Sequence, residues 1–287
     1  MRTTVIIATS GRPIDVTRLL KELDKQAVPP TGVIISAERC EDVPLDIDPK
    51  IDVIYGPRGA SSQRNRGLEK ALPHCEIVVF VDDDYIPSVS FIADIESLFE
   101  CHPQVAGATG LVLADGVTKG GLDPQRARAL NEGFDARRQT LEMYDIEHAY
   151  GCNMAFRTSA IKDLRFDEAL PLYSWQEDVD FGARVAKIGR MVKTNAFAGV
   201  HLGVIGGRTS GKRLGYSQIA NPVYLLRKGT MRFSHAVKLV TKNILANHLK
   251  AFRPEAHVDR LGRLFGNWLA IRDVVFRRDD PRNILQL

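Results

Sequence analysis

Continuous apolar runs alternate with amphipathic segments over the first hundred residues. The runs predict buried strands at 3–9, 32–36, 51–55 and 76–81. Apolar residues at helical spacing predict helices at 14–26, 63–72 and 89–101. Because strands that alternate with helices form parallel sheets covered on both faces, this part of the chain predicts a parallel, doubly wound α/β sheet.

The pattern is less regular in the rest of the chain. A strand is predicted at 106–114, a mobile loop or surface helix at 115–148, a strand followed by a helix start at 149–161, a helix at 174–189, and a short strand and loop at 190–203. From Pro222 onward the pattern is helical and basic. We therefore expect an α/β domain over residues 1–220 and a basic helical extension over residues 221–287.

Composition places the chain among ordinary soluble globular proteins. It has 287 residues, of which 44% are hydrophobic and 26% charged. The sequence has no run of 18 or more apolar residues, so we expect no transmembrane helix. The N-terminus lacks the pattern of a signal peptide, so we do not expect export. The four cysteines form no CxxC pair, so we expect reduced thiols and a cytoplasmic protein.

Charge is distributed unevenly along the sequence. Residues 201–287 contain 16 Lys and Arg against 5 Asp and Glu, whereas the preceding residues are acidic overall. A basic segment of this kind suits a phosphate-rich ligand, an anionic membrane or nucleic acid, and it also suits a solvated helical face.

Three consecutive aspartates follow the fourth predicted strand in EIVVFVDDDYIP. Ligands of parallel α/β sheets bind beyond the carboxyl ends of the strands, which is where these aspartates lie. Asp82 and Asp84 are two residues apart, so in extended geometry they point the same way and can hold a divalent cation. Oxygen ligands favour Mg²⁺ or Mn²⁺ over Zn²⁺. The alternative is a solvated turn.

Two further segments carry candidate chemistry. In GASSQRNRG (59–67), glycine and other small residues precede a predicted helix N-terminus beside Arg64. This arrangement suits contact with a phosphate, and it also suits an ordinary N-cap.

In WQEDVD (175–180), Trp175 could desolvate Glu177 or Asp178 and raise the pKa of that carboxyl group, as a general base requires. The alternative is that these carboxylates only complement the helix dipole. His201 is a third metal ligand or a structural histidine.

GGRTSGK (206–212) has the glycine and lysine spacing of a P-loop. Arg213 stands where the magnesium-binding Ser or Thr of a P-loop belongs, so we reject that interpretation. We expect instead a flexible basic loop in which Arg208, Lys212 and Arg213 clamp a diphosphate. The dinucleotide-binding pattern GxGxxG does not follow any strand.

Taken together and in this order, five motifs resemble the family 2 glycosyltransferases, which have the GT-A fold. They are VIIATSGRP, GPRGASSQRNRGLEKA, VFVDDDYIP, GCNMAFRTSAI and WQEDVDFGARV, and the resemblance covers roughly residues 3–205. It implies a mostly parallel, Rossmann-like sheet flanked by helices. It also implies metal-dependent transfer of a sugar from a nucleotide-diphosphate donor to an acceptor hydroxyl, usually with inversion.

The resemblance also implies roles for individual residues. Asp84, Asp82 and His201 would hold Mn²⁺ or Mg²⁺, and Asp178 would be the base, with Glu177 alongside. The donor nucleotide would contact Thr9, Arg12, Glu38, Arg64, Asn65, Asp82 and Asp83. Trp175 and Asn153 would face the acceptor.

The sequence departs from the family pattern at two places. The second strand ends in Ser36 and Ala37, with Glu38 one step later, where many members have two acidic or amide residues. This leaves the nucleobase open among UDP, GDP and dTDP, of which we expect UDP. The Q-x-x-R-W motif of processive members is absent, so we expect transfer of a single sugar.

Two other classes of function remain as alternatives. One is a nucleotidyltransferase acting on a sugar phosphate, and the other is a non-catalytic protein that binds nucleic acid or membrane. No nucleic-acid-binding module is recognisable, so we expect no nucleic-acid partner. The basic helices over 224–278 either pack on the catalytic domain or lie on an anionic membrane. The second possibility implies a peripheral enzyme on the inner face of the cell membrane, with a saccharide or lipid-linked acceptor.

Overall fold

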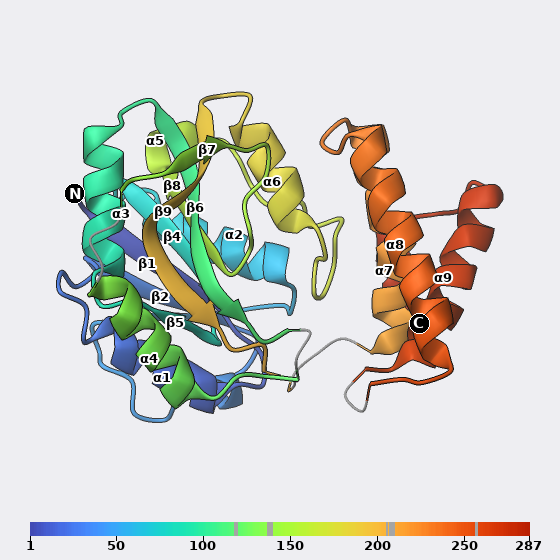
Figure 1. Cartoon of the computed structure of the whole chain (residues 1–287), viewed down its shortest axis with the longest axis horizontal. Helices are drawn as coiled ribbons and strands as arrows, with labels where there is room; N and C mark the ends of the chain where they lie inside the picture. The colour runs from blue at the N-terminus through green and yellow to red at the C-terminus, as the bar shows by residue number, and fades with distance from the viewer. Residues whose placement is uncertain (118–119, 137–139, 205, 207–209, 256–257) are drawn as a thin grey trace.

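A nine-stranded sheet forms the centre of the structure, a computed structural model that describes residues 1–117, 120–136, 140–204, 206, 210–255 and 258–287 (Figure 1). The strands are β1 (Thr3–Ala8), β2 (Gly32–Ala37), β3 (Asp52–Tyr55), β4 (Ile77–Asp82), β5 (Tyr85–Pro87), β6 (Val105–Asp115), β7 (Met143–Asp145), β8 (Asn153–Arg157) and β9 (Arg190–His201). Their order is β3-β2-β1-β4-β8-β6-β9-β5, and β7 pairs with β9.

The first four strands in this order are parallel, which confirms the predicted sheet. Ala8 of β1 lies opposite both Ser36 of β2 and Asp82 of β4, so the carboxyl ends of three strands meet at one edge. Beyond β4 the sheet is mixed, because β8 runs antiparallel to β4 and to β6. The short strand predicted at 190–203 is the twelve-residue strand β9, which pairs with β6 over most of its length.

Helices cover both faces of the sheet because neighbouring apolar residues point in opposite directions. Val5 and Ile7 belong to the cluster that packs on α1 and α3, whereas Ile6 belongs to the cluster on the α2 and α6 side. The helices are α1 (Pro13–Leu23), α2 (Ala60–Ala71), α3 (Phe91–Cys101), α4 (Pro124–Asp135), α5 (Thr158–Ile161), α6 (Glu177–Val185), α7 (Gly211–Lys228), α8 (Phe233–Ala251) and α9 (Arg260–Val275). Within the described ranges, none of the helices has the length and apolarity needed to span a membrane.

The segment 115–148, expected as a loop or surface helix, contains both α4 and the short strand β7. The N-terminus of α4 is capped by Asp123, whose side chain accepts a hydrogen bond from the backbone N–H of Arg126.

The C-terminal helices α7, α8 and α9 gather in a bundle at one end of the molecule (Figure 1). Glycines let α7 and α9 touch through their backbones, since a Cβ on Gly266 would lie 2.1 Å from the carbonyl oxygen of Lys212. Leu225, Met231 and Ala236 of this bundle share a core cluster with Leu170 and Val179 beside α6. The expected boundary after residue 220 falls inside α7.

Candidate active site

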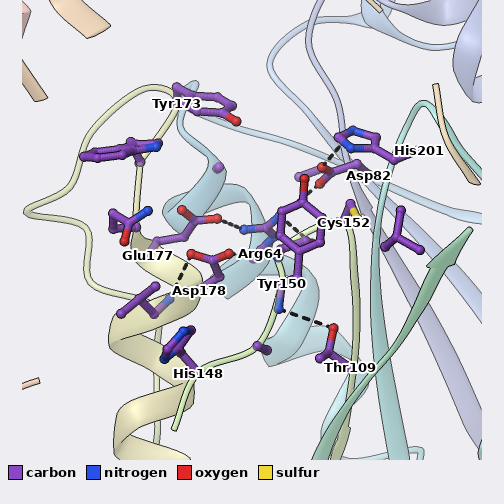
Figure 2. Close-up of a pocket in the computed structure, with 18 of the residues that line it drawn as sticks. Arg64, Asp82, Thr109, His148, Tyr150, Cys152, Tyr173, Glu177, Asp178 and His201 are labelled. Carbon is purple, nitrogen blue, oxygen red and sulfur yellow. Dashed lines mark hydrogen bonds and ion pairs between the residues drawn. The ribbon is translucent and has the colours of Figure 1, made fainter. Parts of the chain in front are cut away.

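A cavity of about 660 Å³ lies at the edge of the sheet where β1 and β4 end. Segments from α2, β4, α6 and β9 converge on it (Figure 2). Nine of the residues singled out in the sequence line this cavity: Thr9, Arg12, Arg64, Asp82, Asp83, Trp175, Glu177, Asp178 and His201.

Asp82, Asp84 and His201 form a group with the geometry of a cation site. Each offers one ligand atom, and these atoms lie within 4.8 Å of one another. The Nε2 atom of His201 is 3.2 Å from Asp84 Oδ1 and 3.7 Å from Asp82 Oδ2. Asp84 Oδ1 is buried and makes no hydrogen bond among the described residues. Because an unsatisfied buried carboxylate oxygen is costly, a divalent cation fits this donor set.

The opposite nitrogen of His201 faces Asp115, at the carboxyl end of β6. Nδ1 lies 3.4 Å from Asp115 Oδ1, and the Tyr150 hydroxyl donates to the other carboxylate oxygen of Asp115. Burial lowers the pKa of His201, but Asp115 and Asp84 outweigh burial and raise it to about 10. A carboxylate behind a histidine fixes the ring so that its other nitrogen can bind metal. Sequence reasoning missed Asp115, although it follows a predicted strand as Asp82 does.

Asp83 points away from this group and toward the N-terminal segment. Thr9 Oγ1 donates to Asp83 Oδ2 at 2.7 Å, and Arg12 Nη1 donates to Oδ1 at 2.8 Å. Burial raises the pKa of Asp83 to about 7, although Arg12 opposes the shift. Arg12 also donates to the carbonyl oxygens of Val204 and Gly206. Arg12 therefore joins the aspartate turn to the segment after β9.

Arg64 occupies the space between the cation group and α6. Its guanidinium donates to Glu177, to Asp82 Oδ1 at 3.1 Å and to the carbonyl oxygen of Gly151 at 3.2 Å. Burial lowers the pKa of Arg64, but Glu177 and Asp82 outweigh burial and raise it above its ordinary value. One buried cation thus neutralises carboxylates from two motifs that are far apart in the sequence.

Asp178 is the carboxylate of α6 that remains available to the cavity. Its Oδ2 accepts the N–H of Gly151 at 2.9 Å, and its Oδ1 accepts the N–H of Val179 at 2.8 Å. Burial raises the pKa of Asp178, and these two N–H groups oppose the rise. Since Glu177 is occupied by Arg64, the geometry favours Asp178 over Glu177 as a proton acceptor.

The loop before α6 is held in an unusual backbone conformation. Leu172, Ser174 and Gln176 have φ values of 59°, 52° and 77°. These values lie in the left-handed region, which residues other than glycine rarely adopt. The intervening side chains, Tyr173 and Trp175, line the cavity. Ser174 Oγ donates to the carbonyl of Leu170 and accepts the N–H of Ser61, which fastens this loop to α2. Strain of this kind persists where surrounding contacts enforce it.

Several predicted site residues lie elsewhere. Asn65 does not line the cavity, because its side chain bonds to the backbone of Phe166 and to Glu168. Asn153, expected to face the acceptor, is instead fully buried within the sheet. Its side chain accepts the N–H of Gly110 and donates to the Tyr85 hydroxyl, so its role is structural. Glu38 is also absent from the lining.

The expected diphosphate loop is partly helical. Lys212 and Arg213 lie in the first turn of α7 and do not line the cavity, and the Lys212 ammonium lies 5.4 Å from the centre of the Phe265 ring. Arg208 lies outside the described residues.

Comparisons with known proteins agree with this arrangement. Residues 35–165 match the family model described as glycosyl transferase family 2. The crystal structure of Staphylococcus aureus TarS 1–349 superposes with a TM-score of 0.56 at 16% identity, over 99% of this chain and 82% of that one. Its complex with UDP-GlcNAc gives a TM-score of 0.58 at 16% identity, over 99% and 83%.

GalNAc-T7 with UDP, GalNAc and Mn²⁺ gives a TM-score of 0.58 at 12% identity. The superposition covers all of this chain and 56% of that one. No curated protein sequence matches the chain. At these identities the structural likeness shows a shared GT-A fold.

The Arg64 contacts generate a stability prediction. Replacing Arg64 with Met leaves Glu177 beside Asp178 with no buried counter-charge, so the free energy of unfolding should fall by about 3–5 kcal/mol. Urea denaturation measures this loss. The control is Arg2→Met, which removes an exposed pair with Glu76 and should cost less than about 1 kcal/mol. Equal losses in the two variants would contradict the role of Arg64.

Proposed function

Because residues 35–165 match the model of the family 2 glycosyltransferases, we propose that this chain moves one sugar from a nucleotide-diphosphate donor to an acceptor hydroxyl. The observation that carries the proposal is the placement of two chemical groups in one cavity. Asp82 and His201 of the cation group line the cavity on one side of Arg64, Asp84 is buried beside them outside the lining, and Asp178 lines the cavity on the other side. A donor site and a proton acceptor are the two parts that the reaction requires.

We propose that Asp82, Asp84 and His201 hold Mn²⁺ or Mg²⁺ when the donor is bound. Such an ion neutralises charge on the departing nucleoside diphosphate. Arg12 adds a second positive charge at this end of the cavity, 3.6 Å from Asp84 Oδ2. The solved structures with this fold include complexes with UDP-GlcNAc and with UDP and Mn²⁺, which supports a UDP-sugar as the donor.

We assign the base to Asp178. An acceptor hydroxyl beside this carboxylate loses its proton as its oxygen attacks the anomeric carbon from the face opposite the diphosphate, which inverts the anomeric configuration. The backbone N–H groups of Gly151 and Val179 fix the direction of the carboxylate. A side chain at position 151 would intrude here, since a Cβ on Gly151 would lie 3.3 Å from Asp178 Oδ2. We propose that Tyr173 and Trp175, which line the cavity, contact the acceptor sugar.

We also propose that the C-terminal bundle rests on an anionic membrane surface. Leu261, Phe265 and Trp268 repeat at helical spacing along α9, and each is more than half exposed. Leu249 and Phe252, at the end of α8, are also exposed. Exposed apolar residues on a strongly basic segment match the composition of helices that lie in a lipid interface. A saccharide carried by a lipid would then be presented close to the cavity.

The role of Asp178 predicts a loss of rate. Asp178→Asn should lower UDP release from a UDP-sugar with Mn²⁺ by about 100-fold to 10,000-fold. Asp24→Asn, at an exposed aspartate just after α1, should leave the rate unchanged. Full activity in Asp178→Asn would overturn the assignment.

The same carboxylate sets the pH dependence. Because burial raises the pKa of Asp178 above 3.8, its basic form is lost on acidification at a higher pH than for an exposed aspartate. The kcat/KM of the wild type should therefore fall as pH decreases, with a midpoint above 3.8. The acid limb should remain in Glu177→Gln. Its disappearance in that variant would assign the limb to Glu177 instead.

The membrane proposal predicts sedimentation with vesicles. The wild type should bind vesicles that contain phosphatidylglycerol and should be released by high salt. Phe265→Ser with Trp268→Ser should weaken binding by about tenfold or more, because each ring contributes buried apolar area. The matched control is Ile14→Ser, at an exposed position on α1 that is 74% accessible. Equal binding of the double variant and the control would reject the surface.

A further inference from the structure

Three basic side chains on the cavity wall lack a counter-ion. Arg12, Arg64 and His201 pair with carboxylates, as described above. In contrast, His148, Lys193 and His235 line the same cavity and make no ion pair or hydrogen bond through their side chains in the described part of the chain. The two imidazole rings meet edge to face, with centroids 5.1 Å apart. These three residues are called the basic subsite below.

The basic subsite is assembled from three separate elements. His148 precedes β8, Lys193 lies on β9 opposite Thr109 of β6, and His235 is in the first turn of α8. Figure 2 shows His148 on the side of Asp178 that is away from Asp82 and His201. His148, with the His235 ring against it, is therefore on the Asp178 side of the cavity, and Lys193 lines the same cavity.

Asp178 interacts electrostatically with His148, which opposes the rise in the pKa of Asp178, but the two side chains form no ion pair or hydrogen bond in the described part of the chain. Two further carboxylates nearby have other partners. Glu147 pairs with Arg232, and Asp145 pairs with Arg190 at 2.6 Å. Burial, together with the positive charge of His148 and Lys238, lowers the pKa of His235. Lys193 thus supplies the positive charge of this part of the lining, and the two imidazoles add N–H donors, while the cation group is rich in carboxylates.

We infer that His148, Lys193 and His235 bind an oxyanion, a phosphate or carboxylate, carried by the acceptor near the hydroxyl that is glycosylated. The inference rests on the proposed function for the identity of the acceptor side. Imidazole N–H groups and an ammonium supply several donors from different directions, as an oxyanion requires. Because the donor diphosphate belongs to the metal end, the basic subsite holds a second, separate negative charge. It selects anionic acceptors over neutral saccharides and positions the hydroxyl beside Asp178.

Phosphate binding tests the basic subsite directly. The full-length protein, saturated with UDP and Mg²⁺ so that the diphosphate end is filled, is titrated with inorganic phosphate while the histidine ring signals are followed by NMR. The signals of His148 and His235 should shift saturably, and those of His201 should not. A parallel titration with acetate shows whether a carboxylate replaces phosphate at the same rings.

Variants separate specific binding from nonspecific attraction. Lys193→Gln should weaken phosphate binding by about threefold to tenfold. Lys242→Gln, an exposed lysine of α8 that does not line the cavity, should leave it unchanged. Equal unfolding midpoints in urea establish that both variants fold. Unshifted His148 and His235 signals, or equal affinities in both variants, would overturn the inference. If the protein binds phosphate at these rings but does not bind UDP and Mg²⁺, the proposed donor is refuted and the basic subsite is retained.

Discussion

The contact of buried Arg64 with Glu177, Asp82 and the Gly151 carbonyl is the interaction on which the site depends. It brings α2, the end of β4, the turn before β8 and the start of α6 to a common point. Without a cation there, carboxylates from two motifs would share a buried space and repel one another. The guanidinium has five donors in a fixed plane, so it also sets the distance between the cation group and Asp178. A lysine could neutralise the charge, but its compact ammonium lacks the rigid planar fork that spans these partners.

The cavity consequently has two ends of different chemistry. Carboxylates dominate around Asp84, where Arg12 and His201 balance them and where we propose that a divalent cation binds. His148, His235 and Lys193 lie beyond Asp178, and in the described part of the chain their side chains form no ion pair with a carboxylate. The strained loop through Ser174 is fastened both to α2 and, through the hydrogen bond from Asn221 to the Trp175 carbonyl, to α7. The C-terminal bundle therefore helps to hold the loop whose Tyr173 and Trp175 line the cavity.

Local patterns in the sequence predicted the parts of the fold that obey local rules. Apolar runs located β1 to β4, and the two-residue spacing of Asp82 and Asp84 correctly indicated that both face one point, with Asp83 turned elsewhere. Contacts between distant segments could not be predicted in this way. Asn65 and Asn153 have the residue type of a binding site, yet they satisfy buried backbone groups. His148 and His235 belong to no motif, and only the packing of α8 brings them together.

The most direct measurement of the central claim is the thermal stability of the protein with nucleotides and metal. Because a ligand that binds only the folded state raises the melting temperature, UDP with Mn²⁺ should raise Tm by more than the sum of the two separate effects. GDP and dTDP, tested in the same way, should give smaller increases. Asp84→Asn should lose the joint effect while keeping its own melting transition. The account is contradicted if no nucleoside diphosphate raises Tm, or if UDP acts equally with Mn²⁺ and with a chelator.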